Sequence, residues 1–582
     1  MKTVIRNICI FLTSKESLLF AMCVINLLYM HYTILATGKM EFIIDPQSYT
    51  DNLWASIFDS LILLSVLFII SAKRLELSLF LTFLITLLWS FCNLIYFRFF
   101  SNYISLSSIS QIGAIKEGFI INTIIEKMSW KDIYYIMSCI LFFIIIYSPI
   151  KHCKHFIKFY YYLAIIGLFF CIGIRASQFT SCIRFYFPTV YNLYFSNSLY
   201  SSSPLVTTFR RGAIRILAAE CLNKFKGPIQ LTNLQIDEIN KCRHASNMTL
   251  CNTKNKKFDN MIFILVESYM SFTTDLTIEG KEVTPFLNAL KKDSANYYNG
   301  KMKPNISIGE SSDGQFIYMT GILPLRTQVT VGQIQETFLP GIPCQLKKNV
   351  SESRIIIPTG PYLWEQRKMS DLYGFNKLYS SNDFLNGKYP TLNDEQVFML
   401  AKQADRKSLK PFFSLILTMS MHYPYKKEID PTFRITDKNI TDDLRYYLNA
   451  CHYTDRIIGD YIQHLKRIGQ YENSLIVITS DHHVHTADFG NDIDTYIPVF
   501  IINGNIDSQT GWKDECNQID IYTTILDLWG IQSNWNGLGQ SLLNTSISKK
   551  TISRETREIS EWLILSDFFG DKMRLFSGNN SK

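Results

Sequence analysis

Acidic and imidazole side chains follow three short apolar runs in the C-terminal half of this sequence. The runs are 261–266, 412–417 and 474–478, and the residues that follow them are Glu267, His422, Asp481 and His482. Each residue alone has an ordinary explanation as a helix cap or a hydrogen-bonded surface group. Together, two carboxylates and an imidazole are ligands that suit Zn²⁺ or Mn²⁺. The pattern therefore predicts a site for one divalent metal ion.

A hydroxyl group could complete this site as a fourth ligand, and a bound cation would lower its pKa and make it a nucleophile. The candidate lies in the segment Gly309-Glu-Ser-Ser-Asp-Gly-Gln-Phe316, which holds two adjacent serines, Ser311 and Ser312. Serines that open helices are commonly N-caps. A hydroxyl at that position also meets helix N–H groups that stabilise a phosphoryl anion.

The elements that must position these residues alternate along the chain from residue 258. Two more short apolar runs, 354–358 and 498–502, and a helical stretch at 519–528 continue the alternation. Strands that are apolar on both faces and separated by helices favour a mostly parallel α/β sheet covered on both faces. Ligands gather at the carboxyl ends of the strands in such sheets. We therefore expect the three polar strand ends to share one rim.

The N-terminal third predicts a five-helix transmembrane bundle. Its apolar runs are 17–37, 53–72, 76–97, 133–150 and 156–176. Each is about long enough to cross a ~30 Å hydrocarbon core. The first could be a signal peptide, but four further runs follow it, which favours an uncleaved anchor. Basic residues precede the first run and lie in the loops 73–75 and 151–155. The positive-inside rule then places everything after about 177 outside the cytoplasm.

Length, composition and charge indicate the partners and the regions of the chain. It has 582 residues, of which 47% are hydrophobic, and a formal net charge of +8. The basic residues are scattered or flank apolar runs, so we expect contact with a membrane and no nucleic acid. We predict four regions, which are the anchor at 1–176, an interfacial connector at 177–257, a catalytic domain at 258–545 and a C-terminal tail at 546–582.

The sequence resembles the lipoteichoic acid synthase family of the alkaline phosphatase and sulfatase superfamily. The resemblance rests on an ordered set of short motifs, Leu265-Val-Glu-Ser268, Gly309 to Phe316, Thr418-Met-Ser-Met-His-Tyr-Pro424, Thr479-Ser-Asp-His482 and Ile519 to Leu528. The resemblance implies a sulfatase-like catalytic domain and a bacterial plasma-membrane protein with that domain outside the cytoplasm.

The resemblance also implies a role for each matched residue. Glu267, Asp481 and His482 match the metal ligands. Ser311 matches the nucleophile, which is a threonine in lipoteichoic acid synthases, and Ser312 is the reserve candidate. His422 matches a histidine that contacts the substrate phosphate. A further pair would bind the headgroup: Trp364 matches in position, and the arginine falls one place later, at Arg367.

The implied reaction transfers a phosphoglycerol-type headgroup from a phospholipid donor to a glycan or lipid acceptor through a covalent serine intermediate. Three alternatives remain open, namely a phosphoethanolamine transferase, a sulfatase- or phosphodiesterase-type hydrolase, and a decayed non-catalytic membrane protein. Sulfatases that make formylglycine use Cys/Ser-x-Pro-x-Arg, and the segment 311–315 does not fit that pattern. Candidates for every ligand and for the nucleophile argue against decay.

Overall fold

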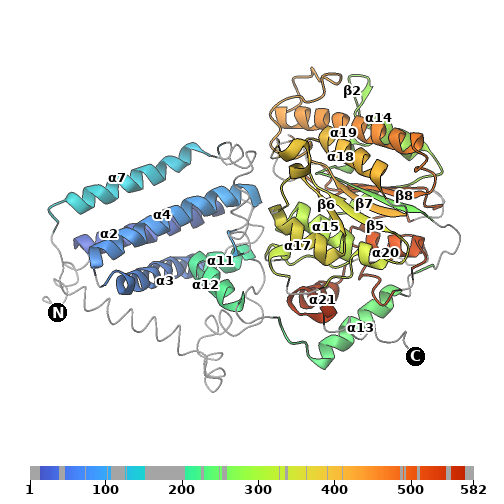
Figure 1. The fold of residues 1–582 in the computed structure, drawn as a ribbon. Helices are drawn as coiled ribbons and strands as arrows, with labels where there is room; N and C mark the ends of the chain where they lie inside the picture. Colours follow the sequence, from blue (N-terminus) through green and yellow to red (C-terminus); the bar gives the residue numbers. More distant parts are fainter. Residues whose placement is uncertain are drawn as a thin grey trace. The chain divides into compact units, whose positions relative to one another are not determined.

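The computed structural model describes residues 13–37, 46–72, 74–100, 103–106, 125, 128–150, 204–224, 228–247, 250–251 and 258–570, the last range with short gaps at 327, 335–337, 362, 388, 390, 409–410, 485–488, 490–492, 507–511, 532 and 546–551. By its internal contacts the chain divides into two compact units (Figure 1). The first is formed by residues 1–109 and 122–227, and the second by residues 110–121 and 228–582.

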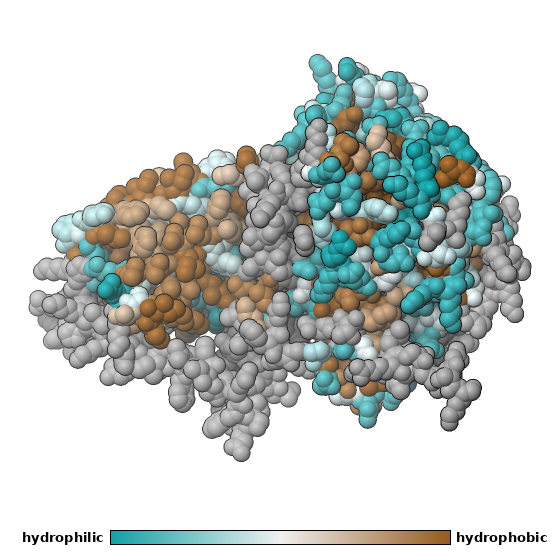
Figure 2. Space-filling view, in the orientation of Figure 1, coloured by the Kyte–Doolittle hydropathy of each residue, from teal (hydrophilic) through white to brown (hydrophobic). Residues whose placement is uncertain are grey.

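Four apolar helices dominate the described part of the first unit. They are α2 (Lys15–Leu35), α3 (Pro46–Ile70), α4 (Leu75–Phe100) and α7 (Ile133–Tyr147). All four are long and apolar enough to cross a membrane, which confirms long apolar helices at four of the five predicted runs. The fifth, 156–176, lies outside the described residues. Large apolar side chains such as Ile70 and Ile136 are 73% and 63% exposed, and they give this unit its hydrophobic surface (Figure 2).

Two helices of the predicted connector pack on α3. They are α11 (Pro204–Arg211) and α12 (Ala213–Lys224). The carboxylate of Asp59, which is 1% exposed within α3, lies 3.0 Å from Nε of Arg215 and accepts a hydrogen bond from the backbone N–H of Ile214. A buried charge needs such a partner, because desolvation would otherwise disfavour it strongly. This buried ion pair and the hydrogen bond beside it therefore join α12 to α3 of the apolar bundle.

The second unit contains an eight-stranded sheet. Its strands are β1 (Asn260–Val266), β4 (Tyr297–Lys303), β5 (Glu352–Ile356), β6 (Lys377–Tyr379), β7 (Phe412–Leu417), β8 (Ser474–Ser480), β9 (Ile497–Ile502) and β10 (Cys516–Asn517), in the order β10-β4-β9-β8-β1-β7-β5-β6. A separate hairpin pairs β2 (Thr277–Ile278) with β3 (Lys281–Glu282). The central strands β8, β1, β7 and β5 are parallel, whereas β9 runs antiparallel to β8 and β4. The sheet is thus mixed and mostly parallel.

Helices cover both faces of this sheet (Figure 1). One face carries α14 (Pro285–Lys292), α18 (Asp394–Lys407) and α19 (Asp442–Arg467), and the other carries α13 (Asn233–Asn247), α15 (Ser311–Thr320), α16 (Ile342–Gln345), α17 (Gln366–Tyr373), α20 (Asp520–Leu528) and α21 (Arg554–Leu565). Alternate residues of β1 supply the two cores, with Phe263 in one and Ile264 in the other. Seven of seven residues in β1 are buried, because both faces are covered.

Candidate metal and nucleophile site

The carboxyl ends of three parallel strands bring the predicted site residues together. Val266 of β1 pairs with Ser480 of β8, so Glu267 and Asp481 leave the sheet side by side. The backbone N–H of Ser268 donates to Asp481 Oδ1 at 2.8 Å. On the other side of β1, the N–H of Glu267 donates to Thr418 Oγ1, just past β7, at 2.9 Å. These bonds hold the Asp481 carboxylate and the Glu267 backbone at the predicted rim.

Helix α15 delivers Ser311 to the same rim. The residue before it, Glu310, adopts φ 48° and ψ −121°, an uncommon conformation for a residue with a side chain. Gly314, one turn into the helix, lies against the backbone of Asp481, where any Cβ would overlap the Asp481 carbonyl oxygen. A sharp turn at Glu310 and a close approach at Gly314 together set the position of the Ser311 hydroxyl.

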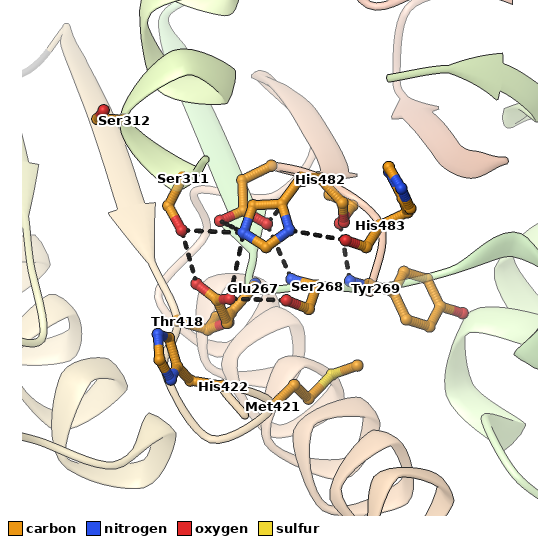
Figure 3. Close-up of polar contacts among 12 residues, drawn as sticks. Glu267, Ser268, Tyr269, Ser311, Ser312, Thr418, Met421, His422, His482 and His483 are labelled. Carbon is orange, nitrogen blue, oxygen red and sulfur yellow. Dashed lines mark hydrogen bonds and ion pairs between the residues drawn. The ribbon is translucent and has the colours of Figure 1, made fainter. Parts of the chain in front are cut away.

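The Ser311 hydroxyl contacts two of the candidate ligands (Figure 3). Its Oγ lies 3.2 Å from Glu267 Oε2 and 3.1 Å from His482 Nε2. The other oxygen of Glu267 accepts a hydrogen bond from Ser268 Oγ at 2.7 Å. Glu267, Asp481 and His482 each offer a ligand atom, and these atoms all lie within 4.8 Å of one another. We name these three residues together with Ser311 the rim cluster.

The imidazole of His482 is oriented by the backbone of the next residue. Its Nδ1 lies 2.9 Å from the carbonyl oxygen of His483. A carbonyl oxygen only accepts, so Nδ1 carries the hydrogen in this contact. In the neutral ring this leaves the lone pair of Nε2, the nitrogen that faces Ser311, for a metal ion.

The electrostatics of the rim cluster fit a bound cation. Burial and the nearby Glu267 raise the pKa of the Asp481 carboxyl to about 7. Burial alone would lower the pKa of His482, but the charges of Asp481, Glu267 and Glu310 outweigh it and raise that pKa to about 9. Both shifts mark an excess of buried negative charge. Two carboxylates, an imidazole and a hydroxyl within reach of one point are a donor set that suits Zn²⁺ or Mn²⁺.

The two adjacent serines differ in their surroundings. The Ser312 hydroxyl is buried and donates to the carbonyl oxygen of Gly309 at 2.6 Å. Figure 3 shows it pointing away from the rim cluster, whereas Ser311 points into it. The geometry therefore favours Ser311 over the reserve candidate.

His422 lies beside the rim cluster and is half-buried. Its Nδ1 faces the carbonyl oxygen of Tyr423. Figure 3 shows its side chain next to Glu267. Burial lowers the pKa of His422, and the charges of His482, Asp481 and Glu310 also act on it. This placement suits a group that meets a ligand next to the cluster.

The two predicted headgroup residues lie on one segment, 363–367. Trp364 adopts φ 50° and packs partly buried against the core, while Arg367, in α17, is exposed. Between them, the buried Gln366 exchanges two side-chain hydrogen bonds with Gln315 of α15, at 2.8 and 3.2 Å. This amide pair ties the segment to the helix that begins with Ser311.

Sequence reasoning missed the residues that support the rim cluster. Asp313, fully buried in α15, accepts hydrogen bonds from the backbone N–H groups of Ser307 and Gly309 at 2.9 Å each and so holds the turn before Ser311. Gln518 donates to the Asp481 carbonyl oxygen at 2.7 Å. Asp313 lies two residues after Ser311, in the motif, but its partners become visible only in the fold.

We expect Gly314→Ala to lower the turnover rate strongly and to change the temperature of thermal unfolding much less. The new methyl group must push α15 away from the Asp481 backbone, and a displacement of about 1 Å can cost roughly 10²-fold in rate. Thermal unfolding and turnover of the full-length protein provide the measurement. The matched control is Gly459→Ala in α19, where a Cβ would meet only the Phe286 side chain, at 3.1 Å. Normal turnover of the Gly314→Ala protein would show that the approach of α15 to Asp481 is not needed.

Comparison with known families matches both units. Residues 1–187 match the family model described as the lipoteichoic acid synthase N-terminal domain, and residues 259–531 match the sulfatase model. The two matched regions follow the division of the chain into an apolar N-terminal part and an α/β part.

Among individual proteins, the chain is 27% identical over 343 residues to lipoteichoic acid synthase 2 of Bacillus subtilis, covering 55% of this chain and 51% of that protein. It is 23% identical over 483 residues to the lipoteichoic acid synthase of Staphylococcus aureus, covering 78% and 72%. The chain thus matches about half the length of the first relative. The crystal structure of the lipoteichoic acid synthase LtaP from Listeria monocytogenes aligns with 59% of this chain and 98% of its own, at 17% identity and a TM-score of 0.44.

Proposed function

Because this chain belongs to the lipoteichoic acid synthase-like family within the sulfatase and alkaline phosphatase superfamily, we propose that it is a membrane-bound phosphoryl-ester transferase. It moves a phosphoglycerol-type headgroup from a phospholipid to a glycan or lipid acceptor of the cell envelope. The catalytic unit lies outside the cytoplasm of a bacterial plasma membrane, as the basic loops of the apolar third predict.

One observation carries the proposal. A serine hydroxyl at the start of a helix lies within 3.2 Å of a glutamate and within 3.1 Å of a histidine, inside a group that also holds an aspartate. That arrangement supplies a nucleophile, acceptors for its proton and a site for a divalent ion. A merely structural serine at a helix start would instead cap its own helix.

The transfer takes two steps. In the first, Ser311 Oγ forms a bond to the donor phosphorus, the bond from phosphorus to the diacylglycerol oxygen breaks, and diacylglycerol leaves with a proton. In the second, an acceptor hydroxyl loses its proton and attacks the same phosphorus, and Ser311 Oγ leaves and regains a proton. The group changes partner with no net oxidation or reduction.

The residues around Ser311 have distinct proposed roles. Glu267, Ser311, Asp481 and His482 would hold one Mn²⁺ or Zn²⁺ ion. When bound, such an ion lowers the pKa of a hydroxyl and offsets phosphate charge. His422 would contact the phosphate and move the proton at the leaving or entering oxygen, for which a lowered pKa keeps it neutral and able to accept.

Two further residues would recognise the headgroup. Trp364 offers an aromatic face and Arg367 an exposed guanidinium, and the Gln315–Gln366 pair keeps their segment in register with α15. We propose that this link keeps the headgroup in line with the Ser311 hydroxyl, which a two-step displacement at phosphorus requires.

A panel of labelled lipid donors tests the function. We expect the full-length protein in detergent, with Mn²⁺ or Zn²⁺, to release diacylglycerol from phosphatidylglycerol and to pass the labelled headgroup to an acceptor. Release from phosphatidylethanolamine alone would make the protein a phosphoethanolamine transferase. Free headgroup phosphate as the sole product, with acceptor present, would make it a hydrolase. No release from any phospholipid would leave a protein without this activity.

A further inference from the structure

A pocket of about 570 Å³ lies beside β4, and none of the rim cluster residues line it. Three lysines and several hydroxyl, amide and aromatic side chains form its walls, among them Ser271, Lys291, Tyr298, Lys301, Tyr496 and Lys513. Asp494 is the only acidic residue among the described residues that line it. The described walls therefore carry a net positive charge and many hydrogen-bonding groups.

A single buried amide positions two of the lysines. The register of β4 with β9 shifts between Asn299 and Met302, and such bulges re-aim side chains. Within this bulge, Asn299 Oδ1 accepts from the backbone N–H of Lys301 at 2.7 Å. Asn299 Nδ2 donates to the carbonyl oxygens of Trp512 and Asp514, the residues on either side of Lys513, at 3.1 and 3.0 Å. Asn299, which is 2% exposed, thus holds the backbone at both lysines.

The three lysines differ in how they are engaged. Lys291 pairs with Asp275, and its ammonium lies 4.7 Å from the centre of the Tyr298 ring. Lys301 and Lys513 are exposed, and neither has a carboxylate partner among the described residues. Two lysines with fixed backbones and available ammonium groups are suited to meeting an anion.

The opposite wall continues from the rim cluster. Ser271 follows Glu267 by four residues, and its backbone N–H donates to the Tyr496 carbonyl oxygen at 2.9 Å. The Ser271 hydroxyl is shielded from solvent and has no hydrogen-bond partner within the described part of the chain. The loop that leaves the metal site thus brings Ser271 and Phe272 to the wall of the pocket.

We propose that this pocket binds the anionic, hydroxyl-rich chain that accepts the transferred group, an inference that rests on the proposed function. Phosphodiester charges pair with Lys301 and Lys513. Tyr298 and Tyr496 offer hydroxyl groups and ring faces to polyol or sugar units. An acceptor held there lies on the loop that leads from Glu267, so its end can extend toward Ser311.

An anionic membrane surface is the other ligand that lysines could meet. Membrane contact calls for basic residues spread over an open face, with attraction worth about 1 kcal/mol per residue. The lysines here converge on a recess with aromatic and amide walls. An extended chain can enter such a recess, whereas a flat bilayer surface cannot. The shape of the pocket therefore favours a chain as its ligand.

The test uses full-length Ser311→Ala protein in detergent and a fluorescently labelled oligomer of glycerol phosphate. We expect the oligomer to bind, and the double change Lys301→Glu with Lys513→Glu to weaken binding about tenfold. Added salt should reduce this difference in oligomer affinity between the two proteins. The same double change is also made in the protein that keeps Ser311. There it should leave the release of diacylglycerol in the absence of acceptor unchanged, and it should raise the acceptor concentration needed for half-maximal transfer.

Lys347→Glu with Lys348→Glu is the matched control, since both lysines are exposed and lie outside the pocket. Equal oligomer affinity in the pocket and control variants would overturn the proposal. Loss of binding to vesicles of phosphatidylglycerol, with oligomer binding intact, would assign the lysines to the membrane instead. A protein that cleaves no donor would refute the proposed function alone, because the binding titration still decides the pocket.

Discussion

Ser311→Ala is expected to leave a folded, metal-binding protein that no longer cleaves its lipid donor. The change removes a hydroxyl that lies 3.2 Å from Glu267 and 3.1 Å from His482. Without a nucleophile no covalent intermediate forms, and turnover should fall by at least about 10³-fold. Diacylglycerol release from labelled phosphatidylglycerol, together with metal content and thermal unfolding, measures the effect.

Ser312→Ala is the matched control for this change. Its hydroxyl makes one bond, to the Gly309 carbonyl oxygen, and points away from the rim cluster (Figure 3). Loss of that bond should cost about 1 kcal/mol of stability and leave substantial activity. Reversal of the two phenotypes, with Ser312→Ala inactive and Ser311→Ala active, would make Ser312 the nucleophile.

Glu267→Gln and Asp481→Asn are expected to abolish turnover by removing the metal ion. Each change keeps the shape of the side chain and removes one anionic oxygen, so metal affinity should fall at least about 100-fold. In the parent protein, metal at about 100 times its dissociation constant adds about 2.7 kcal/mol to the free energy of unfolding. Elemental analysis and metal-dependent thermal shifts should therefore lose their signal together in both variants.

Without metal, the Asp481→Asn change is not expected to lower the stability of the protein. Burial and Glu267 raise the pKa of Asp481 to about 7, so the ionised carboxylate is disfavoured in the fold. A raised acid pKa means that stability falls as pH rises from about 4 to about 7. Without metal at pH 8, Asp481→Asn should thus be at least as stable as the parent. His422→Ala is the control that keeps its metal, and full metal occupancy of Glu267→Gln and Asp481→Asn would refute the ligand assignment.

The fold was predictable where burial leaves a clear pattern. The runs 261–266, 412–417 and 474–478 became β1, β7 and β8, because strands covered on both faces must be apolar throughout. The same pattern says nothing of direction, and β9, equally apolar, runs antiparallel. Strand β4, with Asn299, Gly300 and Lys301 at its bulge, has no such run and was not predicted.

The candidate site was predictable for a similar reason. Glu267 and Asp481 each follow a short apolar run, and neighbouring parallel strands end at the same rim of a sheet. The expectation of a mostly parallel sheet therefore placed the two residues together. The residue types alone did not decide between Ser311 and Ser312, and only the family resemblance pointed to Ser311. The choice depends on the positive φ of Glu310 and on the fit of Gly314 against the Asp481 backbone. Both are tertiary constraints, because the local sequence by itself is compatible with several turn conformations.

Mass spectrometry of the trapped intermediate tests the central claim most directly. Full-length protein is incubated with metal and phosphatidylglycerol without acceptor, quenched in acid and digested, and peptides spanning 304–325 are sequenced. We predict a glycerol phosphate adduct on Ser311, absent from Ser311→Ala and from the metal-free protein. Donor cleavage by the parent protein with no adduct on any serine of that segment would contradict a covalent serine mechanism.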